Sequence, residues 1–271
     1  MTHAPTSRRP RTMHGAAVLA AACLAVPTAV LSAPAAAGTP VHSPVAALDT
    51  AAASDTRAVV EKRRIGRSVK GRAIRAFRLG DPEAKVRAVV LGSMHGDERA
   101  GMQVVDALRR GRPVKGVDLW VVPTMNPDGV ARGTRGNARG VDLNRNFGHQ
   151  WERLTGRYYS GPRRWSEPES RAMRRFLSDV RPRFVVSFHQ PLRGVGRSST
   201  GKPFQRRLSR GLGLPIKAFN CTGHCSGTMT SWFNARFAGT AITVEFGSSP
   251  KRGYLRGKAT RGTLRAVLGR R

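Results

Sequence analysis

The sequence predicts a single α/β domain in which a mostly parallel sheet carries helices on both faces. Apolar runs of strand length alternate along the chain with segments whose apolar residues recur at helical spacing. The apolar runs are continuous, which is typical of strands that are covered on both sides. Strands and helices that alternate over most of a chain indicate this architecture.

The chain begins with a segment that we expect to be removed. Residues 1–38 combine a basic start, an apolar run over 16–33 and a small-residue exit, the three regions of a secretory signal peptide. The run is too short and too rich in alanine for a membrane span, although Cys23 leaves a lipoprotein anchor as an alternative. Residues 39–56 are small and polar and predict a flexible leader, so the domain covers 57–271. We therefore expect a secreted or cell-envelope protein without a transmembrane span.

The order of elements follows from turn and capping signals. The tripeptide at 69–71 separates two extended stretches and predicts a hairpin. Ser166 and Glu169 have the spacing of a capping box, and Pro182 closes the helix that follows them. In chain order, we expect a hairpin over 63–80, strands over 86–94 and 117–125, a helix over 97–111 between them, a helix over 166–182, a strand over 183–190, a helix over 227–237, a strand over 240–249 and a helix over 261–268.

The chain is strongly basic, with 48 lysines and arginines against 16 acidic residues and a formal net charge of +32. Such a charge favours polyanions as partners. Because no basic motif is interleaved with aromatic residues, we expect no specific nucleic-acid binding, and export makes anionic cell-envelope polymers the favoured partner. A general preference for arginine on the surface is the alternative. The tail over 251–271 is either a solvated helix face or a polymer-binding patch.

Two cysteines remain after the predicted cleavage. Cys221 and Cys225 lie close together in the sequence CTGHC, and an exported protein favours a disulfide between them. Free thiols remain an alternative. A metal role is a third, with His224 as the one further ligand nearby.

Ionisable residues stand at the ends of three of the buried strands. His95 and Glu98 follow the first, His189 closes the third and Glu245 closes the fourth. The carboxyl ends of parallel strands meet at one edge of a sheet, where functional crevices form. A catalytic Zn²⁺ typically takes two histidines and a carboxylate, and it needs a base that is not itself a ligand. This pattern predicts a zinc site at His95, Glu98 and His189, with Glu245 as the base.

The sequence resembles a known family through five motifs in a fixed order. HGDE, NPDG…RGNARGVDLNRNF, YYSGPRRWSEPES, SFH and TVEFG are similar to motifs of the zinc metallocarboxypeptidases of the carboxypeptidase A type, over about residues 63 to 250. The short, loop-poor form is most similar to the bacterial murein peptide amidases, which cut the bond between γ-D-glutamate and diaminopimelate in wall peptides. The resemblance implies a mixed, mostly parallel twisted sheet and one Zn²⁺ per chain.

Further site residues are implied by this resemblance. Glu245 matches the glutamate that activates water and passes a proton to the leaving amine. Asn144 and Arg145 match the pair that holds the substrate's terminal carboxylate, which fits the bidentate geometry of a guanidinium. Arg135 matches the arginine that stabilises the oxyanion. Arg132 is the alternative, because the spacing between the motifs is compressed here relative to the family.

The sequence also departs from the family. No tyrosine lies between Tyr159 and Tyr254, where digestive members place a mobile tyrosine over the substrate, and His224 is our expected substitute donor. Thr230 falls near the position that sorts substrate side chains. A threonine there suits a polar, zwitterionic side chain such as that of diaminopimelate.

We therefore expect a monomeric, zinc-dependent metallopeptidase that hydrolyses a peptide bond near a free carboxylate, in peptidoglycan stem peptides. One alternative is a carboxypeptidase that trims ordinary peptides. The other is a non-catalytic protein on the same fold that binds the cell wall through its charge.

Overall fold

The computed structural model describes residues 58–220 and 225–271, so the predicted signal peptide and leader lie outside the described residues. The described chain contains an eight-stranded sheet in the order β1-β2-β4-β3-β5-β8-β6-β7. The strands are β1 (Val59–Arg67), β2 (Ala73–Gly80), β3 (Arg87–Leu91), β4 (Asp118–Val122), β5 (Phe184–His189), β6 (Leu192–Gly196), β7 (Ile216–Lys217) and β8 (Thr240–Gly247).

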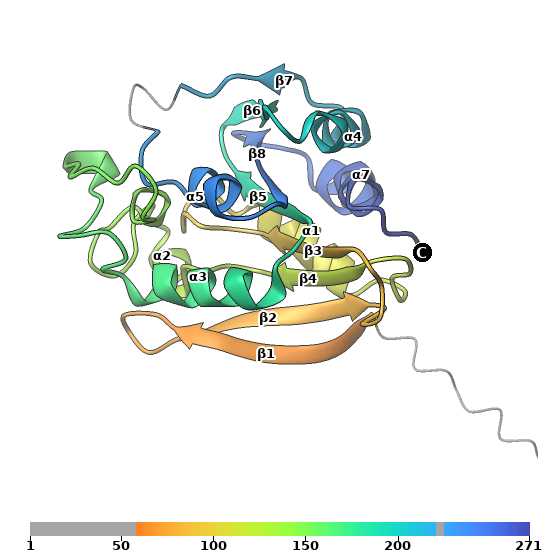
Figure 1. The fold of residues 1–271 in the computed structure, drawn as a ribbon, viewed down its shortest axis with the longest axis horizontal. Coiled ribbons are helices and arrows are strands. Elements are labelled where there is room, and N and C mark those ends of the chain that lie inside the picture. Colours follow the sequence, from red (N-terminus) through yellow and green to blue (C-terminus); the bar gives the residue numbers. More distant parts are fainter. Residues whose placement is uncertain (1–57, 221–224) are drawn as a thin grey trace, which may run out of the picture. The chain divides into compact units, whose positions relative to one another are not determined.

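The centre of the sheet is parallel and its flanks are mixed. Strands β4, β3, β5 and β8 run parallel to one another. The hairpin β1–β2 joins β4 antiparallel on one side, and β6 joins β8 antiparallel on the other. Figure 1 shows the hairpin below the parallel strands. The mixed, mostly parallel sheet that we predicted is confirmed.

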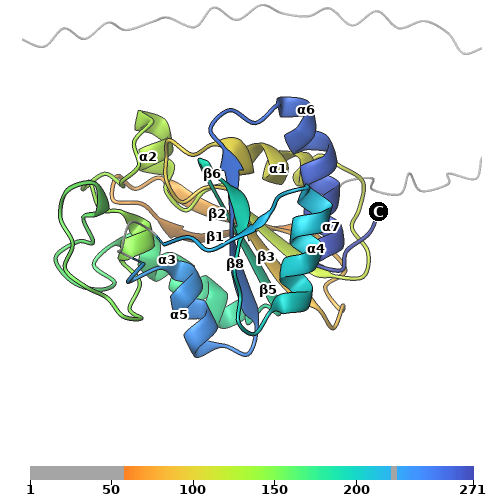
Figure 2. The same cartoon turned by 90° about the horizontal axis from the view of Figure 1, so that it is seen from above.

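Helices cover both faces of the sheet (Figures 1 and 2). One layer contains α1 (Ala100–Arg109), α4 (Lys202–Leu212) and α7 (Thr260–Ala266), and the other contains α3 (Pro168–Val180) and α5 (Met229–Arg236). Successive residues of a strand point to opposite faces, so Val90 packs into the cluster with α1 and α4 while Val89 packs into the cluster with α3 and α5. This double burial explains why the strand sequences are continuously apolar.

The expected capping box of α3 is wrong. The helix has Glu167 as its N-cap and no side-chain cap hydrogen bond. Ser166 Oγ donates instead to Glu167 Oε1 at 2.7 Å, and Glu169 Oε1 accepts from the backbone N–H of Val69 at 2.9 Å. These hydrogen bonds therefore replace the local capping pattern, and the bond from Val69 connects the helix to the β1–β2 turn.

The basic tail is an integral part of the core. After α6 (Arg252–Tyr254), a π-helical turn (Leu255–Ala259) leads into α7, and Leu255, Ala259 and Leu264 are buried against the first helix layer. Its charges occupy the outer side of these helices. No helix within 58–220 and 225–271 is long and apolar enough to cross a membrane.

The segment between β4 and α3 contains little regular structure. It holds the short helices α2 (Pro127–Arg132), η1 (Leu143–Arg145) and η2 (Gly156–Tyr158). Like the loop after β3, it lies beyond the carboxyl end of a parallel strand, which is where α/β sheets place their functional crevices.

Candidate active site

The ionisable residues identified in the sequence converge at the carboxyl ends of β3, β5 and β8. His95 and Glu98 lie in the loop that connects β3 to α1, and His189 is the last residue of β5. Glu245 pairs with His189 in the parallel register of β5 and β8. The parallel direction of the strands therefore brings these residues to one edge, as the sequence predicted.

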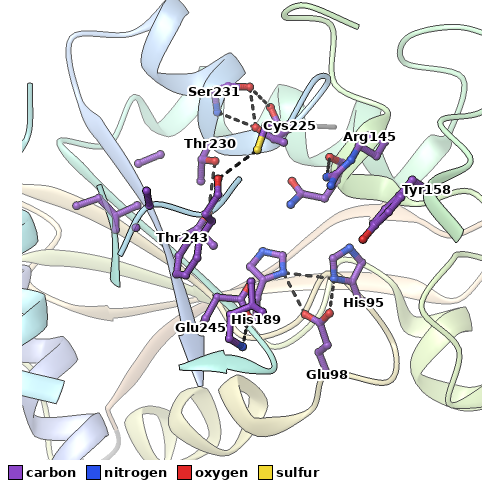
Figure 3. A pocket seen from close by; sticks show the side chains of 18 of the residues that line it. His95, Glu98, Arg145, Tyr158, His189, Cys225, Thr230, Ser231, Thr243 and Glu245 are labelled. Atoms are coloured by element: carbon purple, nitrogen blue, oxygen red, sulfur yellow. Dashed lines mark hydrogen bonds and ion pairs between the residues drawn. The ribbon is translucent and has the colours of Figure 1, made fainter. Parts of the chain in front are cut away.

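His95, Glu98 and His189 form one compact group, and Figure 3 shows their side chains directed toward a common point. Glu98 Oε1 lies 2.9 Å from His95 Nδ1, and Glu98 Oε2 lies 3.1 Å from His189 Nδ1. The two Nδ1 atoms are 3.3 Å apart. All three residues are buried.

These separations fit a zinc ion. Ligand atoms at zinc distances of about 2 Å in a tetrahedral arrangement lie about 3.3 Å from one another. The outer nitrogens of both imidazoles are already engaged, because His95 Nε2 is 2.9 Å from Asp142 Oδ1 and His189 Nε2 is 3.0 Å from Ser187 Oγ. Such outer contacts fix the ring orientation and leave the Nδ1 atoms for a metal.

The electrostatics of this cluster favour positive charge. Burial opposes the charged form of His95, but the carboxylates of Asp142 and Glu98 overcome it and raise the pKa of His95 to about 9. Burial likewise opposes ionisation of Glu98, yet the neighbouring histidines hold its pKa well below the usual range. The donor set and the charge balance both fit a divalent cation.

Glu245 stands beside the cluster without belonging to it. Its side chain is nearly buried, and Oε2 accepts a hydrogen bond from the backbone N–H of Leu192 at 3.3 Å. Burial raises the pKa of this carboxyl, and the nearby charge of Glu98 adds to the rise. A carboxylate with a raised pKa is a suitable proton acceptor near neutral pH.

The structure distinguishes the two candidate arginines. Arg135 Nη1 donates to Glu98 Oε1 at 3.0 Å, and Arg135 Nη2 donates to Asp142 Oδ2 at 2.8 Å. Arg132 instead donates to the backbone carbonyl oxygens of Asn137 and Ala138. Arg135 is therefore the arginine beside the candidate metal site.

Asn144 and Arg145 lie on η1, which Asp142 caps by accepting from the N–H of Asn144 at 2.9 Å. Asn144 Oδ1 accepts from the N–H of Met229 at 3.1 Å, which leaves the amide nitrogen as the donor. Arg145 is only 4% exposed, and among the described residues its Nε has no hydrogen-bond partner. A buried guanidinium N–H without a partner is costly unless an anion satisfies it.

One pocket of about 480 Å³, which we call the active-site pocket, is lined by His95, Glu98, Arg135, Asn144, Arg145, His189 and Glu245. Thr230 also lines it, with its Oγ1 3.4 Å from Thr243 Oγ1. His224, the expected substitute donor, lies outside the described residues. The described part of the lining, beyond the residues predicted from the sequence, includes Arg157, Tyr158, Arg197, Phe219, Ser231 and Asn234.

Tyr158 is one of the pocket residues that the sequence analysis missed. Its ring centre lies 5.5 Å from the guanidinium carbon of Arg135 and 5.0 Å from that of Arg145. Its phenol oxygen points into the pocket, toward the two histidines (Figure 3). The one available signal was a pair of tyrosines in an irregular stretch after Arg145, and nothing in that pattern indicates which of the two faces inward.

Cys225 lies in the pocket wall and is disulfide-bonded, which excludes the free-thiol alternative for this residue. Cys221, the expected second half of the bond, lies outside the described residues.

Comparison with known proteins gives matches of family, sequence and structure. A family model described as zinc carboxypeptidase matches residues 45–192. Murein peptide amidase A of Vibrio campbellii is 32% identical over 194 residues, which cover 66% of this chain and 77% of that protein. Murein peptide amidase A of Escherichia coli (strain K12) is 34% identical over 118 residues, which cover 38% of this chain and 49% of that protein.

Solved structures of zinc carboxypeptidase-like proteins are similar to this chain in fold. The murein-tripeptide amidase of Escherichia coli O157 is 27% identical, with a TM-score of 0.62 over 77% of this chain and 92% of that one. Carboxypeptidase A from Helicoverpa armigera is 17% identical, with a TM-score of 0.66 over 78% of this chain and 69% of that one, and shares the fold. The predicted zinc carboxypeptidase-like fold is confirmed.

Proposed function

Because the chain belongs to the zinc carboxypeptidase family, we propose that this metallopeptidase hydrolyses peptidoglycan stem peptides, at the bond between γ-D-glutamate and diaminopimelate. The relatives named as murein peptide amidases support this substrate class. The observation that carries the proposal is the buried, incompletely paired guanidinium of Arg145, which shares a pocket with the candidate metal site. To pair with this guanidinium, the substrate residue beside the cleaved bond must carry a free carboxylate.

The zinc would be held by His95, Glu98 and His189. When bound, it supplies a Lewis acid that polarises the scissile carbonyl and makes a water easier to deprotonate. Glu245 accepts the proton of the attacking water and then donates it to the leaving amine. The burial of its carboxylate beside the candidate ligands supports both roles.

Arginine side chains bind two groups of the substrate, the oxygen of the scissile carbonyl and the terminal carboxylate. Arg135 donates to the oxygen that becomes negative when the carbonyl is attacked, a role that its position beside Glu98 supports. Arg145 and the amide nitrogen of Asn144 bind the terminal carboxylate. Thr230 and Thr243 supply hydroxyls for a polar substrate side chain.

The proposal predicts a preference among substrates. Purified protein with zinc should cleave an L-Ala-γ-D-Glu-diaminopimelate tripeptide, and the same tripeptide with an amidated terminal carboxylate should react about a hundredfold more slowly, because an Arg145 pair is lost. A panel of ordinary C-terminal peptides is the control, followed by mass spectrometry with and without a chelator. Loss of terminal residues from the ordinary peptides, with the tripeptide left intact, would establish the trimming carboxypeptidase instead. The relatives are named as amidases and carboxypeptidases, which gives the non-catalytic alternative no support.

We also propose that the protein is exported and adheres to anionic cell-envelope polymers. The basic and apolar N-terminal pattern supports export. A surface pocket of about 610 Å³, the basic pocket, is lined by five cations and no acid. They are Lys85, Arg87, Arg181, Arg183 and Arg236, at the amino ends of β3, β5 and β8. Since the active-site pocket lies at the opposite ends of these strands, a polymer bound here leaves it open.

Adhesion predicts a salt-dependent affinity that maps to the basic pocket. Replacing Arg181, Arg183 and Arg236 together by glutamine should weaken binding to a polymeric phosphodiester by about tenfold or more at low ionic strength. The control variant loses the same charge elsewhere, at the exposed residues Arg163, Arg206 and Arg252. Equal weakening in both variants, measured by co-sedimentation, would show that net charge alone drives adhesion and would contradict a role for the basic pocket.

A further inference from the structure

The described lining of the active-site pocket has an uneven charge balance. Its acidic side chains are Glu98 and Glu245, and both belong to the reaction centre. Four arginines line the same pocket, and the proposed function uses only Arg135 and Arg145. Arg157 and Arg197 remain without a role.

Arg197 lies next to the side of the pocket that is lined by Thr230 and Thr243, which we call the threonine wall. Strand β6 runs antiparallel to β8, with Val195 opposite Val244, so the chain that leaves β6 passes Thr243. At Gly196 an added Cβ would lie 3.1 Å from the carbonyl oxygen of Thr243, which shows how closely the two strands approach. Arg197 follows immediately, and its backbone N–H donates to the carbonyl oxygen of Lys217 at 3.0 Å. The position of Arg197 is therefore fixed by strand pairing.

This wall lies across the pocket from the proposed carboxylate site. Figure 3 shows Thr230 and Thr243 on one side and Arg145 on the other, with the histidine pair between the two sides and below them. Thr230 and Thr243 come from α5 and β8, whereas Arg145 comes from η1. A substrate residue whose terminal carboxylate binds Arg145 would extend its side chain toward the threonines.

The guanidinium of Arg197 is available to a ligand. Within 58–220 and 225–271, its side chain makes no hydrogen bond or ion pair and stacks on no ring, and the residue is exposed. A cation at this wall repels a side chain that ends in an ammonium group alone. It attracts one that ends in a carboxylate, which a guanidinium binds bidentately.

We propose that Arg197 selects diaminopimelate by binding the second carboxylate at the far end of its side chain. This inference rests on the proposed function and adds the residue that reads the substrate side chain. Lysine has the same amine and nearly the same carbon chain but lacks the second carboxylate. The hydroxyls of Thr230 and Thr243 accept hydrogen bonds from the amine that both side chains carry.

The test compares two substrates that differ in this one carboxylate. The values of kcat/KM are measured for L-Ala-γ-D-Glu-diaminopimelate and L-Ala-γ-D-Glu-L-Lys, with the wild-type protein and with Arg197→Gln and Arg197→Lys. The wild type should prefer diaminopimelate by about ten- to a hundredfold, the range expected for a hydrogen-bonded charge pair. Arg197→Gln should remove most of this preference by slowing only the diaminopimelate substrate, and Arg197→Lys should retain part of it.

Arg157→Gln is the matched control, because it removes the same charge from another part of the pocket lining. It should leave the ratio of the two kcat/KM values unchanged. A wild type without preference, or an Arg197→Gln variant that slows both substrates equally, would overturn the role of Arg197 while leaving the proposed function intact. A wild type that cleaves neither tripeptide but trims ordinary peptides would overturn the proposed function, and the inference with it.

Discussion

Replacing Glu245 by glutamine is expected to lower kcat by about 10²- to 10⁴-fold, the range that general acid–base catalysis contributes. Glutamine keeps the shape of the side chain and can still contact the N–H of Leu192, which donates to Glu245 at 3.3 Å. It cannot accept the proton of water. Since Glu245 is not one of the three grouped candidate metal ligands, zinc content should remain at one ion per chain.

The measurement combines kcat on the stem tripeptide with zinc content by atomic absorption. Glu83→Gln is the matched control, because Glu83 is exposed and lies outside the active-site pocket. Its kcat should equal that of the wild type. Wild-type kcat in Glu245→Gln would remove Glu245 as the proton acceptor, whereas loss of zinc from that variant would make it a metal ligand instead.

The sequence predicted the positions of the candidate site residues well where the fold leaves little freedom. His189 and Glu245 end continuous apolar strands, and the parallel pairing of β5 and β8 places them in register. Their continuous hydrophobic pattern marks them as strands that are buried on both faces, which is typical of the parallel centre of a sheet. The two strands beyond β8 were harder to predict, because β6 and β7 are short, and β7 is exposed.

Side chains carried by the irregular segment between β4 and α3 could be identified only through family motifs. No periodicity separates Arg135 from Arg132 or Tyr158 from Tyr159. Arg135 reaches the site because Asp142 holds its guanidinium through two hydrogen bonds, at 3.0 and 2.8 Å. Such contacts are tertiary, so sequence spacing does not encode them. The failed capping box has the same cause, since Glu169 bonds to the N–H of Val69, 100 residues away.

Replacing His189 by alanine is expected to leave the protein with less than one zinc per chain. Measurable hydrolysis should be lost with the zinc. The change removes one of the three grouped candidate ligands and leaves Glu98 without the contact of 3.1 Å that His189 provides. Two remaining ligands hold zinc far less firmly than the three that a catalytic site requires. Asp142→Asn should have a graded effect, with zinc affinity reduced about 10- to 100-fold, because it weakens the contact that orients His95.

The control for the ligand variant is His149→Ala, since His149 lies outside the active-site pocket. It should keep one zinc per chain and wild-type activity. Zinc affinity is measured by competition with a chromophoric chelator, and circular dichroism confirms that each variant is folded. One zinc per chain bound by folded His189→Ala with wild-type affinity would exclude His189 as a ligand, and the chemistry assigned to this edge of the sheet would then lack its metal. The geometry of the cluster therefore requires the largest loss of zinc affinity in His189→Ala, a smaller loss in Asp142→Asn and none in His149→Ala.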